Sequence, residues 1–310
     1  MKQVFLFPGQ GAQYPGMAKD LHEASAEVRR YFEAASDILR KDLKALLFNG
    51  TEDELKVTDN TQAAVTLTNI AAARVLEERG IKADICAGFS VGEYAALFQA
   101  GILDLEGLFK AVAIRGEAME KASRLADRPE GPSGMSAVLG LPFAEASKVM
   151  EGLKDKEVFI ANHSSPVQIV IAGTTGGLDI AEAALKAAGA KRAIRLKVSG
   201  PFHTPLLASA AREFAERSAS IPFAEPRLPM VSNVTALPVR SAAEARELAS
   251  LQIQGMVRWV DSMTWIRGQG EARILETGPG KVLGGLWKAF NPDVPCMPAG
   301  TMEEIGSIVS

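Results

Sequence analysis

Cysteine is scarce in this sequence, and neither sign of charge is in large excess. Cys86 and Cys296 are the two cysteines among 310 residues; they cannot build a disulfide framework and do not have the spacing of metal ligands. We therefore expect a protein of a reducing cytoplasm without a metal site. The formal net charge is -3, which argues against a nucleic-acid-binding protein.

Long apolar runs are absent as well. No stretch approaches the length of a membrane span, and the N-terminus lacks the layout of a signal peptide, so we expect no membrane association. The composition is otherwise that of a globular protein, with 47% hydrophobic and 23% charged residues. A chain of this length can bury a large core and form more than one domain.

Apolar, strand-like segments alternate with helical ones along most of the chain. This alternation predicts an α/β fold: a mainly parallel sheet with flanking helices, as in hydrolases. The expected strands are 2–7, 85–87, 229–233 and 272–276, and the expected helices are 18–40, 60–79, 93–98, 105–121, 208–219, 242–252, 257–268 and 281–290.

A different order of strands and helices is expected after the turn-rich segment 128–134. Strands are expected at 135–139, 158–162, 167–172 and 193–198, and helices at 143–153 and 180–188. The order β-α-β-β-α-β is ferredoxin-like. We therefore expect a ferredoxin-like small domain at 132–198, inserted into a discontinuous large catalytic domain formed by 1–131 and 199–310.

The segment Gly88-Phe89-Ser90-Val91-Gly92 has the G-x-S-x-G pattern of a nucleophile elbow. It stands between an apolar strand and a helix, which is the context that such an elbow requires. The backbone N–H of Val91 would point at an oxyanion formed beside Ser90. A glycine-rich connection without chemistry is the alternative, and the strand-turn-helix context favours function.

A serine nucleophile needs a base, and the chain has only three histidines. His22 lies in a charged, amphipathic segment and is expected to face solvent, whereas His163 is expected at a hairpin tip. His203, in a loop after a strand, is therefore the best candidate. No Asp or Glu between Ser90 and His203 follows a strand end convincingly, so we expect a Ser-His dyad whose imidazole is oriented by a carbonyl or an amide.

Arg115 lies on the otherwise apolar stripe of the helix 105–121 and should be buried. A buried guanidinium needs an anionic partner. An internal Asp or Glu could supply it, or the arginine could await the carboxylate of a ligand; on this segment alone both remain open. Similarly, the Pro8–Gln13 loop after the first strand is either a plain turn or a loop that aims the backbone N–H of Gln10 at a site.

Taken together, these segments resemble the malonyl-CoA:acyl-carrier-protein transacylase family nearly end to end. The matching segments are Phe7–Gln13, Gly88–Tyr94, Arg115-Gly116, Met135–Gly140, Ala161-Asn162, Ser165-Pro166, Gly200–His203, Val257–Trp259 and Glu276–Gly280.

The resemblance implies a role for each site residue. Ser90 would carry the acyl group as an ester, with His203 as the base, held by a backbone carbonyl near Gln252. The backbone N–H groups of Gln10 and Val91 would form the oxyanion hole.

For the acyl group, the resemblance implies that Arg115 binds the malonyl carboxylate and that Asn162 helps to line the cleft. Phe202, before the histidine, resembles the malonyl-selecting form of related polyketide acyltransferases. Two positions depart from the family: Phe89 stands where it usually has His, and Met256 where it usually has Pro. Phe89 leaves the acyl group or the pathway open.

The implied reaction is a ping-pong transfer of malonyl from malonyl-CoA to the phosphopantetheine thiol of acyl carrier protein, supplying fatty-acid synthesis, without metal or redox cofactor. The alternatives are a malonyltransferase of a polyketide or malonate decarboxylase system, a serine acyl hydrolase on the same fold, and a non-catalytic binding module. We expect the protein to be a monomer. An acidic carrier protein would dock on basic residues, and the candidates are Lys191, Arg192, Arg195 and Lys197. The alternative is that these residues form a solvated edge of the small domain.

Overall fold

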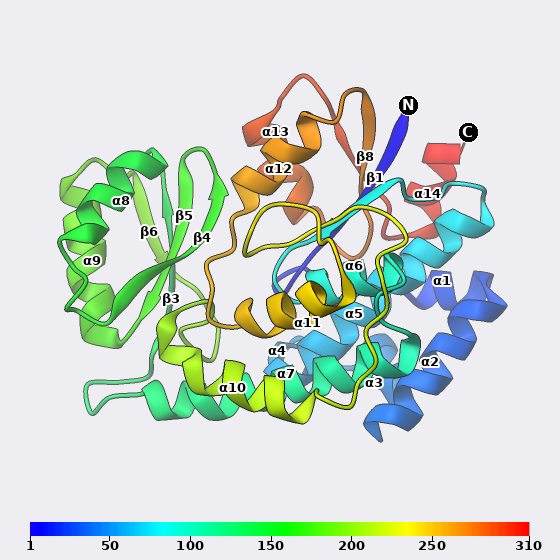
Figure 1. The fold of residues 1–310 in the computed structure, drawn as a ribbon, viewed down its shortest axis with the longest axis horizontal. Helices are drawn as coiled ribbons and strands as arrows, with labels where there is room; N and C mark the ends of the chain where they lie inside the picture. The colour runs from blue at the N-terminus through cyan, green and yellow to red at the C-terminus, as the bar shows by residue number, and fades with distance from the viewer. Residues whose placement is uncertain (310) are drawn as a thin grey trace.

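The computed structural model describes residues 1–309, which form a large and a small lobe (Figure 1). The large lobe is built on a five-stranded sheet in the order β7-β2-β1-β8-β9, in which every pairing is parallel. Its strands are β1 (Lys2–Phe7), β2 (Ile85–Gly88), β7 (Met230–Val231), β8 (Ala272–Glu276) and β9 (Cys296–Pro298).

The strand β1 explains how this sheet is covered. Phe5 and Phe7 belong to one buried cluster, whereas Val4 and Leu6 belong to another. Since successive side chains of a strand point to opposite faces, both faces of the sheet are packed against helices. The α/β fold with a mainly parallel sheet is therefore confirmed.

The helices of the large lobe come from both halves of the chain. They are α1 (Lys19–Ala24), α2 (Ala26–Leu39), α3 (Leu43–Asn49), α4 (Glu52–Lys56), α5 (Thr58–Glu78), α6 (Gly92–Gln99), α7 (Leu105–Ala126), α10 (Ala208–Arg217), α11 (Ala242–Leu251), α12 (Trp259–Arg267), α13 (Val282–Phe290) and α14 (Met302–Val309), with a 3-10 turn at Pro205–Leu207. Within residues 1–309, none of them combines the length and the apolar character that crossing a membrane would require.

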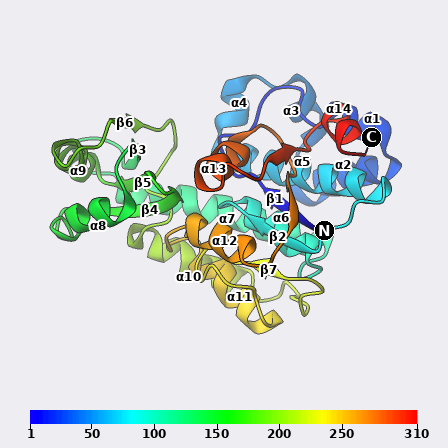
Figure 2. The same cartoon turned by 90° about the horizontal axis from the view of Figure 1, so that it is seen from above.

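The small lobe, residues 134–195, stands beside the large one in both views (Figures 1 and 2). Its sheet has the order β4-β5-β3-β6 with antiparallel pairings, as a ferredoxin-like fold requires. Its elements are β3 (Gly134–Leu139), α8 (Phe143–Glu151), β4 (Val158–Ser165), β5 (Gln168–Gly173), α9 (Thr175–Ala187) and β6 (Arg192–Arg195). We keep 132–198 as the proposed bounds of the small domain.

Backbone hydrogen bonds also tie the two lobes together. Val257 N–H donates to the Ala161 carbonyl (2.8 Å), and His163 N–H donates to the Val257 carbonyl (2.9 Å). Val257 thus lies beside β4 and forms one parallel bridge with Asn162. For this reason the helix predicted at 257–268 begins only at Trp259.

Other predicted elements also need correction. The predicted helix 18–40 is two helices, because Ser25 is extended and its hydroxyl accepts the Val28 N–H at the start of α2. The predicted strand 229–233 is reduced to Met230–Val231. A turn follows, in which the Ser232 N–H donates to the Leu237 carbonyl. The elements that the pattern did not predict are α3, α4, β9 and α14.

Candidate active site

The elbow, Gly88–Gly92, joins β2 to α6 by a turn too tight for larger residues at its two glycines. A Cβ added to Gly88 would lie 2.0 Å from the carbonyl carbon of Gly92, and one added to Gly92 would lie 2.2 Å from the Phe7 carbonyl oxygen. Ser90, at the tip, has φ 53°, in the left-handed region. Such a conformation is strained for any residue with a side chain and typifies functional turns.

The Ser90 side chain meets His203. The distance from Ser90 Oγ to His203 Nε2 is 2.7 Å, and His203 Nδ1 lies 2.8 Å from the Gln252 carbonyl oxygen. Since a carbonyl oxygen only accepts, Nδ1 carries the proton and Nε2 is free to accept one from Ser90. Burial, and then the charge of Arg115, lower the pKa of His203 to about 3, so its imidazole is neutral near pH 7.

Arg115 lies directly beside this pair and is only 1% exposed. Its guanidinium donates to Gln62 Oε1 (2.7 Å), Gln252 Oε1 (3.0 Å) and Ser90 Oγ (3.3 Å). All three acceptors are neutral, and Nε is buried without an acceptor within residues 1–309. Of the two alternatives left open above, these contacts therefore favour a guanidinium that awaits an anion.

Two backbone N–H groups, those of Gln10 and Val91, belong to segments next to Ser90. The Pro8–Gln10 loop follows β1, next to β2, and a Cβ on Gly9 would lie only 2.4 Å from the Phe89 carbonyl oxygen and 3.6 Å from Ser90 Cβ. Neither Gln10 N–H nor Val91 N–H donates to any acceptor in the described part of the chain. The loop and the elbow thus bring two unused N–H groups close to Ser90.

A cleft of about 380 Å³ opens between the lobes next to His203. It is lined by Ser147, Met150, Glu151, Lys154, Val158, Phe159, Ile160, His203, Pro205, Gln254 and Met256. Asn162 lies on β4, two residues beyond this lining; it is 7% exposed, and its Oδ1 has no partner in the described residues. Phe202 is 5% exposed and packs into the core of the large lobe rather than into the cleft.

The two departures from the family pattern lie close to the site. The Phe89 ring packs edge-on against Trp259, with ring centroids 5.3 Å apart. Met256 lines the cleft. At the elbow, Phe89 therefore makes an apolar contact with Trp259.

Three buried residues of the site were not found from the sequence. Asn233 accepts the Ser90 N–H and donates to the Gly88 carbonyl, while Gln62 holds Arg115. Glu93 accepts the Asn233 N–H (2.8 Å), and burial raises the pKa of its carboxyl to about 7. Asn233 follows β7, the neighbour of β2, so its position at the carboxyl edge of the sheet was the available signal.

The other two histidines differ from expectation. His163 is not at a hairpin tip, because β4 runs on to Ser165 and the turn is only two residues long; its ring is buried and stacks on Phe143, with centroids 3.8 Å apart. His22 is half-buried, edge-on to Phe32 and Phe48, rather than simply facing solvent. Neither ring contacts the Ser90 site.

The proposed docking residues lie around β6, at the opposite edge of the small sheet from β4, which lines the cleft. Arg195 is already paired with Asp179 (2.7 Å) and Glu182.

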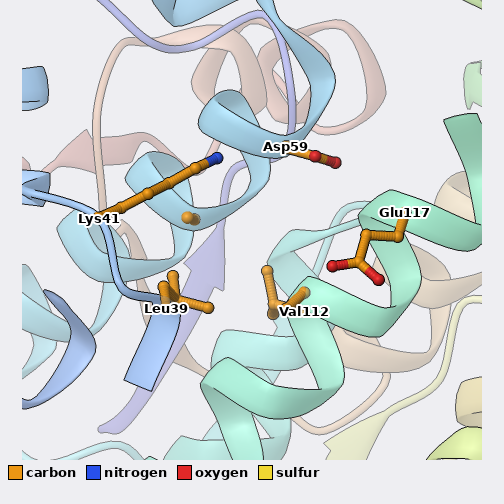
Figure 3. Close-up of a pocket in the computed structure, with 7 residues that line it drawn as sticks. Leu39, Lys41, Asp59, Val112 and Glu117 are labelled. Atoms are coloured by element: carbon orange, nitrogen blue, oxygen red, sulfur yellow. The ribbon is translucent and has the colours of Figure 1, made fainter. Parts of the chain in front are cut away.

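A second cavity, of about 120 Å³, lies between α2, α5 and α7 and is bordered by Lys41, Asp59 and Glu117 (Figure 3). No histidine lines it, whereas His203 lines the cleft, so the cleft is the candidate active site.

With this geometry in view, comparison with known proteins is informative. The model of the family described as "Acyl transferase domain" matches residues 4–268. The chain belongs to this acyltransferase family. The acyltransferase is 40% identical over 292 residues to the malonyl CoA-acyl carrier protein transacylase of Bacillus subtilis, covering 94% of this chain and 90% of that one.

Solved structures agree with this assignment. The malonyl CoA-acyl carrier protein transacylase from Coxiella burnetii superposes on the acyltransferase with a TM-score of 0.94 at 35% identity, covering 100% of this chain and 97% of that one. A malonyl-transacylase solved in complex with its type II PKS acyl-carrier protein gives a TM-score of 0.93 at 36% identity, with 100% and 99% covered. The fold of the acyltransferase is thus that of its family.

Proposed function

We propose that this acyltransferase moves a malonyl group from malonyl-CoA to the phosphopantetheine thiol of an acyl carrier protein, through an ester on Ser90. The observation that carries the proposal is the meeting of three side chains: Ser90 Oγ lies 2.7 Å from His203 Nε2 and 3.3 Å from Arg115 Nη2. A nucleophile, a neutral base and a buried cation for a carboxylate are the groups that malonyl transfer needs.

In the first half-reaction, Ser90 Oγ attacks the thioester carbonyl while its proton passes to His203 Nε2. The Gln252 carbonyl accepts the Nδ1–H and steadies the imidazolium that forms. The oxyanion receives hydrogen bonds from the N–H groups of Val91 and Gln10, each worth about 3 kcal/mol in such sites. The C–S bond then breaks, and coenzyme A leaves with the proton from His203.

In the second half-reaction, the carrier-protein thiol gives its proton to His203 and attacks the ester carbonyl. Ser90 leaves and regains its proton. Arg115 binds the malonyl carboxylate in both halves, which selects the acyl group and fixes it against attack by water. Asn162 borders the cleft from β4, and Phe202 supports the His203 loop from the core. This chemistry calls for no metal or redox cofactor.

Intact-protein mass spectrometry tests the proposal. After mixing with malonyl-CoA, wild-type protein should gain the mass of one malonyl group, and holo acyl carrier protein should remove it. Ser90→Ala and His203→Ala should show no adduct. Absence of the adduct in the wild type would contradict the proposal, and its loss to water alone at the same rate would favour a hydrolase.

The carrier protein and pathway form a separate question. The relative seen with a type II PKS carrier protein makes a polyketide partner the second candidate beside fatty-acid synthesis. Transfer rates to fatty-acid and polyketide carrier proteins, measured side by side, distinguish them. Lys191→Glu and Arg192→Glu test docking at β6: unchanged carrier-protein turnover would exclude it. We propose the cytoplasm as the compartment, in agreement with two free cysteines.

A further inference from the structure

The carboxamide of Asn233 bridges both ends of the elbow. Asn233 lies two residues beyond β7, the strand next to β2, and is completely buried. Its Oδ1 accepts the Ser90 N–H at 2.8 Å, and its Nδ2 donates to the Gly88 carbonyl oxygen at 2.6 Å. One side chain therefore fixes the backbone immediately before the elbow and the backbone of the nucleophile itself.

This contact coincides with backbone strain. Ser90 has φ 53°, and a non-glycine residue in the left-handed region costs about 1–2 kcal/mol, so surrounding contacts must hold it there. The Asn233 carboxamide satisfies the Ser90 N–H, while the next N–H, that of Val91, stays free for an oxyanion. Without Asn233, the Ser90 N–H would lose its acceptor.

Asn233 is itself fixed from two sides. Its N–H donates to Glu93 Oε2 (2.8 Å), on the helix after the elbow, and its carbonyl accepts the Arg258 N–H (2.9 Å). Arg258 directly follows Val257, which pairs with β4 of the small lobe. A continuous path of hydrogen bonds and backbone thus runs from the cleft wall to the nucleophile.

We propose that Asn233 is a positioning residue for acyl transfer: it holds Ser90 in the left-handed conformation that aims Oγ at His203, and it anchors this conformation to the bridge between the lobes. The proposal rests on the proposed function in so far as Ser90 is the nucleophile. It assigns Asn233 no contact with substrate.

The test measures the rate at which Ser90 reacts with a fluorophosphonate, beside the rate of malonyl-adduct formation. In the probe reaction the Oγ–P bond forms, the P–F bond breaks, the serine proton passes to His203 and fluoride leaves. In Asn233→Ala, both rates should fall about 10- to 100-fold, as expected for a misplaced reacting group. The KM for malonyl-CoA should change little, because Arg115 remains.

Asn233→Asp adds a readout that a merely structural role would not give. A protonated carboxyl group can accept the Ser90 N–H and donate to the Gly88 carbonyl, as the amide does, whereas a carboxylate can only accept. The deficit of this variant relative to wild type should therefore shrink as pH falls from 8 to 5, while that of Asn233→Ala stays constant. The control is Thr68→Ala, which loses a buried hydrogen bond within α5 and should keep the wild-type rate.

Folded Asn233→Ala that reacts at the wild-type rate would overturn the proposal. If Asn233→Ala does not fold, a deficit of Asn233→Asp that does not change with pH would overturn it instead. Wild-type protein that reacts with the fluorophosphonate but gains no malonyl group would contradict the proposed function alone, and the probe rates would still decide the role of Asn233. Failure of the wild type to react with either reagent would remove both proposals.

Discussion

At the scale of single residues, Arg115 is a buried cation whose hydrogen-bond acceptors within residues 1–309 are all neutral. Burial lowers the pKa of its guanidinium, which reflects the cost of keeping the charge away from water. Binding an acyl carboxylate would offset this cost, because a guanidinium and a carboxylate form charge-assisted, bidentate hydrogen bonds. Arg115 should therefore contribute more to the choice of acyl group than to the chemistry of the ester.

Replacing Arg115 by alanine should reduce malonyl transfer by about 30- to 5,000-fold, since truncating one partner of a buried charge pair costs about 2–5 kcal/mol. Transfer of a neutral acetyl group should fall much less, so the ratio of acetyl to malonyl transfer should rise. Single-turnover rates with both thioesters measure this ratio. Arg124→Ala, on the exposed part of α7, is the matched control. Undiminished malonyl transfer in Arg115→Ala would contradict our role for this arginine.

The pKa of His203, lowered to about 3 by burial and by Arg115, predicts an unusual pH profile. A free histidine would lose its function as a base below about pH 6.5. In the wild type, kcat/KM for acetyl-CoA should not show an acid limb near pH 6.5 that belongs to His203.

In Arg115→Gln one cause of the lowered pKa is absent, so the acid limb should move to higher pH. Kinetics between pH 4 and 8 on both proteins check the direction of this change. Identical profiles would mean that the charge of Arg115 does not lower the pKa of His203, and a wild-type limb near pH 6.5 would mean that burial does not lower it.

At the scale of elements, the sharp connection between β2 and α6 depends on glycine for space. Gly88 and Gly92 would each bring a Cβ to within 2.0–2.2 Å of backbone atoms. These are contacts with main chain rather than with flexible side-chain ends. The strand and the helix would have to move apart to relieve them.

Gly88→Ala should therefore lower the free energy of unfolding by about 3 kcal/mol or more, at the upper end of the range for overpacked sites. Gly285→Ala is the matched control: a Cβ there would meet nothing within 4 Å, and a helix-interior glycine replaced by alanine gains about 0.5–1 kcal/mol. Urea unfolding of both variants measures the difference. Equal stability of the two would mean that the turn can widen without cost.

At the scale of the whole molecule, buried titratable groups make stability depend on pH. Burial raises the pKa of Glu93 and that of Glu276 to about 7 from 4.5. The folded state then holds more protons than the unfolded state between about pH 4.5 and 7, so these groups make the protein less stable as pH rises through that window. His203 acts oppositely between about pH 3 and 6.5, because its folded pKa is lowered.

Glu93→Gln should remove one of these contributions. Relative to wild type, its free energy of unfolding should increase from pH 5 to pH 8 by at most about 3 kcal/mol, the value for a pKa shift of this size. Urea unfolding at both pH values tests the direction. Glu145→Gln, on the exposed side of α8, is the control. A difference that stays the same at pH 5 and pH 8 would show that Glu93 titrates much as it would in water.

The sequence predicted the main groups of the candidate site for identifiable reasons. Ser90 stands in a local five-residue pattern, and three histidines allow elimination. Arg115 interrupts an apolar helical stripe, which marks a buried charge whatever its partner. The α/β alternation and the β-α-β-β-α-β order are likewise local periodicities, so both sheets could be inferred before the topology was known.

What could not be predicted depends on contacts between distant segments. Asn233 and Gln62 lie 143 and 53 residues from their partners in the site, and no local pattern marks an amide that forms such a contact. Val257 reads as the first residue of a helix, but pairing with β4 keeps it extended. The same holds for β9, only three residues long, which exists because β8 offers it a neighbour.

The central place of β1 has a consequence for synthesis of the chain. β1 pairs on one side with β2 and on the other with β8, whose first residue, Ala272, is translated 265 residues after Phe7. At about 5–20 residues per second, a ribosome needs about 13–50 s for this distance. Throughout that interval the backbone N–H and C=O groups on one edge of β1 have no strand to pair with, and this edge is where a chaperone would be needed.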